Sequence, residues 1–475
     1  MTKKFYVTTP IYYVNDVPHI GHAYTTIAAD VLARYHRLSG EDVFFLTGTD
    51  EHGAKVAEAA KEASKKPKKF CDEVVSRFVD AWKKLNISND YFIRTTDPRH
   101  EKIVQKLLQK VYNNGYIYEG TYEGLYCVGC EKFLTETDLV NSRCPLHPNQ
   151  KPLKQKEKNY FFKLSTFRKK LIKVIENRKD SNHYEILPEE RKNEILGKLK
   201  QELDDVSISR AAVPWGIPIP WDKTQTIYVW VDALLNYYTA IQFLKNKTKF
   251  WPAELHLIGK DILWFHTVIW QALLLAAGLP LPKQVFAHGF FTVDGKKMSK
   301  SLGNVISPDD LIKKFGVDGV RYLILSGFPF GTDGDISLEK FKVRYNADLA
   351  NGLGNSVARL AKLCESSGLE FKATKPLKTT YSKEQQEAFE NFRFDVVLQN
   401  IWTVYLHAID KHIDQHSPWL IKDKNELQRV LQEEVNELRE FTTKLKPFLP
   451  ETAEKIEKQF KGPKIKSEKP LFPRL

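Results

Sequence analysis

The chain has 475 residues, of which 42% are apolar and 28% charged, a composition typical of folded proteins that excludes disordered, collagen-like and disulfide-scaffold classes. Its length exceeds a single core of about 100–200 residues, so several domains are expected. Lysine and arginine outnumber aspartate and glutamate by 72 to 59, a net charge of +13, which favours a polyanionic partner but also arises on lysine-rich surfaces that bind nothing.

No apolar run approaches the roughly 20 residues of a membrane span, and residues 1–7 lead into a strand pattern with no signal-peptide core. We therefore expect a soluble cytoplasmic protein with no membrane partner. Cys127, Cys130 and Cys144 lie in one short segment and the total of five cysteines is odd, which favours a reducing compartment and a metal site over disulfides.

The first 55 residues alternate between strand and helix signals. Residues 5–9 are β-branched and aromatic, apolar side chains recur at helical spacing over residues 23–35, and residues 43–46 form a short apolar run. This pattern predicts a βαβ unit with buried parallel strands.

A second α/β stretch lies far downstream, with strands expected at residues 226–231, 255–258 and 285–288 and a helix over 262–277. The intervening residues carry the cysteine cluster, a lysine-rich connector and a polar helix over 167–178, and do not continue the α/β alternation. After residue 345 the strand signals stop, and amphipathic helices are expected over 349–363, 383–406 and 425–445.

These patterns predict a parallel α/β sheet split by an insertion and followed by an all-α helical bundle. The expected divisions are the first half of the sheet domain (1–115), the insertion (116–224) with its cysteine segment (127–147), the second half (225–290), a lysine-rich loop region (291–345) and the bundle (346–475).

The segment Pro18-His19-Ile20-Gly21-His22 stands where the first helix is expected to begin. Gly21 lets the backbone approach a ligand, the helix N-terminus offers N–H groups, and the imidazoles of His19 and His22 add donors, so the segment suits a polyphosphate. An ordinary helix start with two partly exposed histidines is the alternative, because so short a pattern recurs by chance.

A lysine-rich loop, Lys297-Met298-Ser299-Lys300-Ser301, follows the second half of the split sheet. Lys297 and Lys300 can neutralise a triphosphate and the departing pyrophosphate, and Ser299 supplies a hydroxyl donor. A solvated lysine loop is the alternative.

The insertion contains Cys127-x-x-Cys130 followed by Cys144-x-x-His147. Three thiolates and one imidazole give closed tetrahedral coordination for one Zn²⁺, and the two-residue gaps form tight knuckles. Four protein ligands leave no open position, so we expect a structural zinc site.

The histidine motif and the lysine loop, in this order, resemble those of class I aminoacyl-tRNA synthetases. The neighbouring segments 8–13, 48–53, 228–233 and 258–266 are similar to the methionyl-tRNA synthetase family, and the resemblance covers nearly the whole chain. It implies a Rossmann-type catalytic sheet split by a zinc-binding connective insertion, a stem-contact region together with the lysine loop over 291–345, and a bundle that binds the anticodon. It also implies a ligase that uses ATP with Mg²⁺ to convert L-methionine to methionyl-adenylate and transfers the methionyl group to the 3′ end of tRNA(Met) for protein synthesis.

The resemblance also assigns residues by position. Catalysis and ATP binding fall to His19, His22, Lys297 and Lys300, with Gly21 and Ser299 as further ATP contacts. The methionine side-chain pocket comprises Ile11, Tyr13, Trp230, Ala233, Tyr237 and His266, while Asp50 holds the α-ammonium. A thioether packs well on aromatic faces, and a tyrosine or histidine can offer its sulfur a weak donor. The anticodon positions are Asn355, Arg359, Pro418 and Trp419.

Each assignment has a plainer alternative. Trp230 on a strand and His266 on an apolar helix face also fit a core, and the bundle residues fit a polar pair and a capping tryptophan. Leucyl and cysteinyl ligases share the two motifs, but an insertion of roughly 110 residues leaves little room for an editing domain, and the cysteines are confined to that insertion. A non-enzymatic tRNA-binding relative is another alternative. The chain stops shortly after the bundle, so we expect a monomer.

Overall fold

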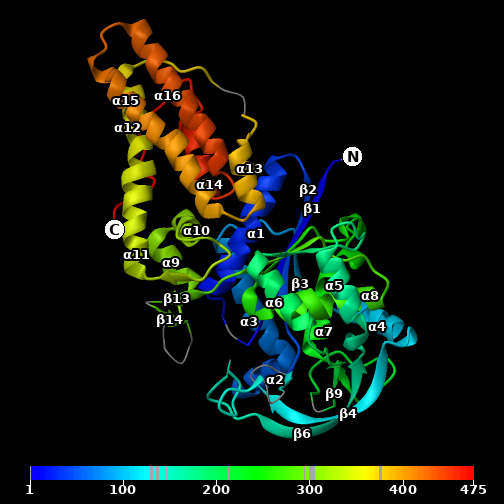
Figure 1. The fold of residues 1–475 in the computed structure, drawn as a ribbon. Helices are drawn as coiled ribbons and strands as arrows, with labels where there is room; N and C mark the ends of the chain where they lie inside the picture. The colour runs from blue at the N-terminus through cyan, green and yellow to red at the C-terminus, as the bar shows by residue number, and fades with distance from the viewer. Residues whose placement is uncertain are drawn as a thin grey trace.

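The computed structural model describes residues 2–15, 17–128, 132–134, 138–145, 147–211, 213–293, 295–298, 305–373 and 377–475. An α/β part and an elongated helical bundle lie side by side, and the bundle projects away from the sheet (Figure 1). The fold class is therefore the expected one. Within the described part of the chain, no helix is both long and apolar enough to cross a membrane.

A six-stranded parallel sheet is the centre of the α/β part, in the order β3-β2-β1-β11-β12-β7. The strands are β1 (Lys4–Tyr13), β2 (Asp42–Asp50), β3 (Tyr91–Arg94), β7 (Glu185–Leu187), β11 (Leu255–Gly259) and β12 (Gln284–His288). From β1 the chain first builds outward to β3 and later returns to add β11 on the other side of β1. Ligands of such sheets bind at the carboxyl ends of the strands where the order reverses, here between β1 and β11.

Helices cover both faces of this sheet: α1 (Ile20–Leu38), α2 (Ala54–Glu62), α3 (Pro67–Lys84), α4 (Pro98–Asn113), α7 (Val229–Phe243) and α8 (Trp270–Ala276). Alternate residues of β1 enter different cores, since Phe5 and Val7 pack with α1 and α3, whereas Tyr6 packs with α4 and α7. Because both faces of the sheet are buried, the sequence of each strand is a nearly continuous apolar run.

Two of the strand expectations need correction. Residues 226–231 were expected to form a strand, but only Thr226–Ile227 does so, as β10, and α7 begins at Val229. A short apolar run does not distinguish a buried strand from a buried helix, and α7 is buried on most of its surface. Residues 116–224 were expected to lie outside the sheet, yet β7 from this stretch pairs with β12.

The rest of the stretch 116–224 forms an antiparallel sheet, β5-β4-β6-β8, whose long strands curve around one end of the molecule (Figure 1). The strands of this sheet are β4 (Ile117–Cys127), β5 (Lys132–Leu134), β6 (Leu153–Phe162) and β8 (Val206–Ser207). The same stretch also contains α5 (Arg168–Glu176), α6 (Glu189–Leu199) and β9 (Ser209–Arg210), which pairs with β10. A small sheet of β13 (Phe291–Val293), β14 (Lys296–Lys297) and β15 (Gly334–Ile336) follows β12, together with α9 (Pro308–Phe315) and α10 (Val317–Ser326).

The bundle contains α11 (Leu338–Arg344), α12 (Asn355–Ser367), α13 (Lys383–Glu390), α14 (Phe394–Ile401), α15 (His407–His416), α16 (Lys424–Leu445) and α17 (Pro450–Gln459). The π-helical segments Tyr345–Gly354 and Trp402–Leu406 join α11 to α12 and α14 to α15. The helix expected over 383–406 is interrupted near Phe392, whose φ of 57° lies in the left-handed region.

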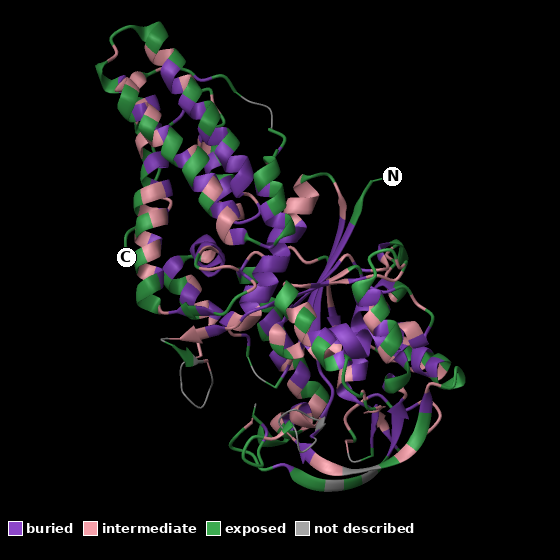
Figure 2. Ribbon diagram, in the orientation of Figure 1, coloured by how far each residue is buried: buried purple, intermediate pink, exposed green. Residues whose placement is uncertain are grey.

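The bundle is joined to the α/β part through a continuous core, seen as buried residues running from the sheet into the inner bundle faces (Figure 2). Arg321 of α10 is fully buried at this junction. It donates to Asp30 Oδ2 of α1 at 2.7 Å and to the carbonyl oxygens of Pro447 and Phe448 at 2.9 and 2.8 Å. The helix that begins at the histidine motif is thereby tied to the turn between α16 and α17.

Candidate active site

The two histidines of the first motif cap α1 with their own side chains. His19 Nδ1 accepts the Gly21 backbone N–H at 3.1 Å, and His22 Nδ1 accepts the His19 backbone N–H at 3.3 Å. Because both Nδ1 atoms are acceptors, the proton of each neutral ring is on Nε2. Nε2–H is therefore the donor group of each ring.

The rings of His19 and His22 stack with centroids 3.6 Å apart. Burial lowers the pKa of His22 well below its usual value, and the neighbouring His19 lowers it further. Two imidazolium ions in this arrangement would repel each other, which favours the neutral form of His22.

The sequence also predicted free helix N–H groups for phosphate, and this part of the expectation is wrong for the first two positions. The Ile20 N–H donates to the Ile306 carbonyl oxygen at 3.0 Å, and the Gly21 N–H is used by His19. These two N–H groups are therefore already satisfied within the protein.

The structure brings the first motif against the described part of the lysine loop. Ile306, which accepts the Ile20 N–H, follows that loop in the chain, and Met298 Cε lies 3.8 Å from the position a Cβ on Gly21 would occupy. The same Cβ would lie 3.0 Å from the His19 ring, so a side chain at this position would crowd that ring, and glycine permits the close approach. The backbone of Lys297 lies in β14, paired with Thr292 of β13. The side chain of Lys297, and Ser299 and Lys300 altogether, lie outside the described residues.

Three of the residues expected to bind methionine, Ile11, Tyr13 and Asp50, lie at the carboxyl ends of β1 and β2. Between Thr8 and Ile11, β1 contains one residue more than β2, a bulge at Pro10 that redirects the end of the strand. Beyond the bulge Tyr13 pairs with Asp50 at the end of β2. Asp50 is 3% exposed.

Aromatic rings from β1, α7 and η5 (Phe265–Ile269) pack together beside these residues. Trp230 stacks on Phe265 with centroids 3.9 Å apart, and Tyr13 meets Trp230 edge-on at 6.3 Å. Ile11 packs against the same core, and Ala233 lies one turn after Trp230 on α7. Phe265 was not among the predicted residues, although it precedes His266 in a segment singled out in the sequence.

Tyr237 and His266 are linked by a hydrogen bond within the same core. His266 lies in a π-helical turn, η5 (Phe265–Ile269), and its Nδ1–H donates to the Ile262 carbonyl oxygen at 3.0 Å. Its Nε2 therefore accepts the Tyr237 hydroxyl proton at 2.8 Å. Burial lowers the pKa of His266 to about 4, so the ring is neutral. Burial raises the pKa of Tyr237, and the charge of Asp50 adds to that rise.

Beside this pocket, His52 and His100 both contact Asp232, a network that no sequence motif indicated. His52 Nδ1 lies 2.7 Å from Asp232 Oδ2, and His100 Nε2 lies 2.7 Å from Asp232 Oδ1. His52 was part of a segment singled out in the sequence, but neither its partner nor His100 could be identified from spacing.

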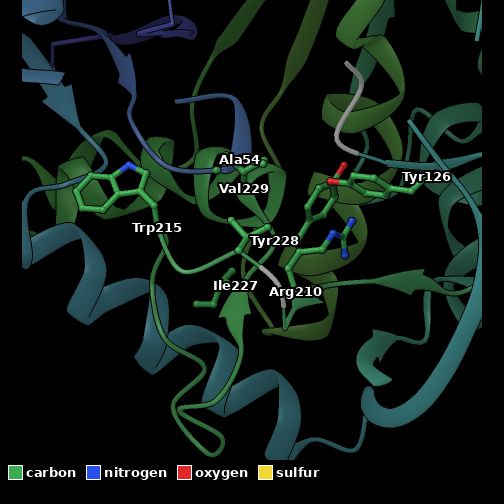
Figure 3. Close-up of a pocket in the computed structure, with 9 residues that line it drawn as sticks. Ala54, Tyr126, Arg210, Trp215, Ile227, Tyr228 and Val229 are labelled. Carbon is green, nitrogen blue, oxygen red and sulfur yellow. The ribbon is translucent and has the colours of Figure 1, made fainter. Parts of the chain in front are cut away.

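A small pocket opens at the start of α7 (Figure 3). Tyr126, Arg210 and Tyr228 lie together on one side of it and Trp215 on the other. The Arg210 guanidinium lies 4.2 Å from the centre of the Tyr228 ring, a cation–π contact. Tyr126 directly precedes Cys127, so the pocket joins the cysteine segment to the helix that carries Trp230.

Cys127, Cys144 and His147 form a cluster that can hold a metal ion. The Sγ atoms of both cysteines lie 3.8 Å from His147 Nδ1, and the His147 N–H donates to the Cys144 carbonyl oxygen in a tight turn. Tetrahedral zinc with its usual bond lengths places sulfur and nitrogen ligands about 3.6 Å apart, so the donor set and spacing fit this ion. Cys130, the expected fourth ligand, lies outside the described residues.

In the bundle, Arg359 and Trp419 lie together. The Arg359 guanidinium is 5.5 Å from the centre of the Trp419 ring and donates to Asp414 Oδ1 at 2.6 Å. Trp419 is 55% exposed, Asn355 is exposed one turn from Arg359 on α12, and Pro418 is buried.

The sequence matches the family described as tRNA synthetases class I (M), over residues 5–151 and 134–361. A methionine–tRNA ligase from Clostridium acetobutylicum is 47% identical over 96% of this chain and 73% of its own length. One from Caldanaerobacter subterraneus is 42% identical over 100% of this chain and 79% of its own length. Among solved structures, Mycobacterium tuberculosis methionyl-tRNA synthetase in complex with methionyl-adenylate aligns with a TM-score of 0.90 at 35% identity, covering 100% of both chains.

Proposed function

The chain belongs to the class I aminoacyl-tRNA synthetases of the methionine type, a ligase that activates methionine with ATP and charges tRNA, and we propose which of its residues perform each step. This proposal rests on the contact between two motifs that lie far apart in sequence. The Ile20 N–H donates to the Ile306 carbonyl oxygen, and Met298 lies against Gly21, close to the cluster of aromatic residues. A nucleotide placed there has phosphate donors on one side and an amino-acid site on the other.

In the first step, the methionine carboxylate attacks the α-phosphorus of ATP and pyrophosphate leaves. No protein nucleophile is required, so the residues act by positioning and charge stabilisation. His19 and His22 donate Nε2–H to the phosphates, while Lys297 and Lys300, with Ser299, neutralise the charge that develops on pyrophosphate. Mg²⁺ arrives with ATP and adds positive charge at the phosphate oxygens.

Methionine is held at both ends. Asp50, buried at the end of β2, binds the α-ammonium group, and the side chain enters the pocket of Ile11, Tyr13, Trp230, Ala233, Tyr237 and His266. The Tyr237 hydroxyl proton is already donated to His266 Nε2, and the single ring N–H of His266, on Nδ1, donates to the Ile262 carbonyl oxygen. The thioether is therefore selected mainly by its packing on aromatic faces rather than by a hydrogen bond to sulfur.

In the second step, a ribose hydroxyl of the terminal adenosine of tRNA(Met) attacks the carbonyl carbon of the adenylate, which forms the ester and releases AMP. The bundle, residues 346–475, binds the anticodon, with Trp419 as a stacking platform, Asn355 and Arg359 as readers of base edges and Pro418 as the rigid support of the tryptophan turn. Residues 1–115 and 225–290 form the catalytic part, and residues 291–345 hold the lysine loop. The insertion, 116–224, binds one structural Zn²⁺ through Cys127, Cys130, Cys144 and His147.

The test is ATP–pyrophosphate exchange with each of the twenty amino acids, followed by charging of tRNA(Met). We expect exchange with methionine and with no other natural amino acid at comparable rates. Exchange that depends on leucine or cysteine would show instead that the chain is a leucyl or cysteinyl ligase. Exchange with none of the twenty, together with binding of tRNA, would show a non-enzymatic tRNA-binding protein.

A further inference from the structure

Three buried ionisable side chains meet beside the methionine pocket without a part in the steps above. His52, Asp232 and His100 are 3%, 1% and 0% exposed. They come from three elements: His52 follows the end of β2, Asp232 lies in the first turn of α7, and His100 lies in the first turn of α4. Only folding brings them to one point.

Both oxygens of Asp232 accept hydrogen bonds from the histidines. His52 donates from Nδ1 and His100 from Nε2, each at 2.7 Å. His100 Nδ1 lies 2.6 Å from Thr239 Oγ1, further along α7, so α4 contacts α7 at two points through this one ring. The remaining nitrogen of His52 lies 3.8 Å from Glu101 Oε1 on α4.

Burial disfavours the charged forms of His52 and Asp232, but their charged neighbours favour those forms more strongly. Burial lowers the pKa of His52, but Asp232, with smaller contributions from Glu101 and Glu51, raises it by more, so the pKa lies above its usual value. Burial raises the pKa of Asp232, but His52 and His100 outweigh it, so the pKa lies below its usual value. Removal of one member leaves an uncompensated charge inside the protein.

The network connects the two halves of the methionine site. Asp50, proposed to bind the ammonium group, lies two residues before His52, whereas the pocket residues Trp230, Ala233 and Tyr237 all lie on α7 with Asp232. The separation between the ammonium site and the side-chain pocket thus depends on how the start of α7 is fixed against the end of β2.

We propose that His52, Asp232 and His100 are positioning residues for methionine: the Asp232 carboxylate fixes the start of α7 against both β2 and α4, and so sets the distance between Asp50 and the side-chain pocket. This inference rests on the proposed function. The proposed phosphate site depends on other contacts, which fix the start of α1. The Ile20 N–H donates to the Ile306 carbonyl oxygen, and Thr25 Oγ1 lies 2.6 Å from His288 Nε2. Loss of the network therefore weakens the use of methionine and spares that of ATP.

The test uses variants that keep or remove single hydrogen bonds. Asp232→Asn removes the charge and one acceptor. His100→Gln keeps a donor near the Nε2 position, whereas His100→Ala removes it, and His52→Asn keeps a donor near Nδ1 without a titrating group. Asp318→Asn is the matched control, because Asp318 is an equally buried carboxylate (4% exposed) that accepts the Thr452 N–H at 2.6 Å in the bundle.

The measurements are the KM values for methionine and for ATP in pyrophosphate exchange, with a thermal melt of each variant. We expect Asp232→Asn and His100→Ala to raise the methionine KM by about tenfold or more while the ATP KM changes by less than about threefold. His100→Gln should stay within about threefold of the wild type, and Asp318→Asn should lower the Tm without changing the methionine KM.

A pH profile separates positioning from simple structural loss. In the wild type the methionine KM should rise as the pH passes above the raised pKa of His52, because the buried Asp232 charge then loses its partner. Glu101 and Glu51 also face His52, and Glu51 is paired with Arg94. His52→Asn should lack this rise.

An unchanged methionine KM in Asp232→Asn, or equal effects of His100→Gln and His100→Ala, would overturn the inference. If Asp232→Asn does not fold, the two His100 variants decide. Absence of methionine-dependent exchange in the wild type would instead refute the proposed function itself.

Discussion

Trp419→Ala separates tRNA recognition from folding, because the side chain is 55% exposed at the tip of the bundle. Its contact with Arg359, 5.5 Å from the ring centre, contributes about 0.5–1 kcal/mol, so stability should fall by no more than about that amount. Stacking of a base on an aromatic ring contributes about 1–3 kcal/mol. We therefore expect kcat/KM for tRNA(Met) to fall by about 5- to 150-fold, with ATP–pyrophosphate exchange unchanged.

The matched control is Trp402→Ala, in the same bundle. Trp402 is 7% exposed, donates from Nε1 to the Asp348 carbonyl oxygen at 3.3 Å and packs on Tyr322 with ring centroids 5.0 Å apart. Its loss should cost about 3–5 kcal/mol of stability and reduce both reactions through the fraction unfolded. If Trp419→Ala lowered exchange as much as tRNA charging, Trp419 would be a structural residue and the proposed anticodon site would be wrong.

Four further results are expected. Lys300→Ala should slow adenylate formation by about 10²–10³-fold with methionine binding nearly intact, and wild-type exchange rates would refute its role. Tyr237→Phe leaves the buried Nε2 of His266 without its donor at 2.8 Å, which costs about 1–3 kcal/mol and should raise the methionine KM several-fold; an unchanged KM would place the pair outside the site. Cys144→Ser should reduce the zinc content, measured by atomic absorption, from one ion per chain toward zero, whereas an unchanged content would exclude the cluster. The pKa of His266 is lowered to about 4, so the unfolded chain binds its proton first on acidification and stability from this group falls between about pH 6.5 and 4. In chemical denaturation the decline over this range should be smaller in His266→Gln, and equal pH dependence would contradict it.

The central sheet was accessible to sequence reasoning because its strands are short apolar runs buried on both faces. The edge strand β7 was not, since it has only three residues within a polar stretch. The start of α7 was mistaken for a strand because its residues are apolar in nearly every position, which removes the periodicity that separates the two structures.

The candidate site was foreseeable where one segment carries the chemistry, as in His19-Ile20-Gly21-His22. What could not be foreseen is how the chain satisfies its own hydrogen bonds. The N–H groups of Ile20 and Gly21 are taken by Ile306 and His19, so the imidazoles are the phosphate donors that we propose instead. The contact of Asp232 with two histidines from other elements has no spacing in the sequence, because it exists only after folding.

The most direct test of the account is a crystal structure with methionine and a non-hydrolysable ATP analogue. The account predicts one triphosphate within about 3 Å of the Nε2 atoms of His19 and His22 and of the Lys300 ammonium group, with methionine between Asp50 and Trp230. A nucleotide that contacts only one of the two motifs, or that binds at another face of the sheet, would contradict it.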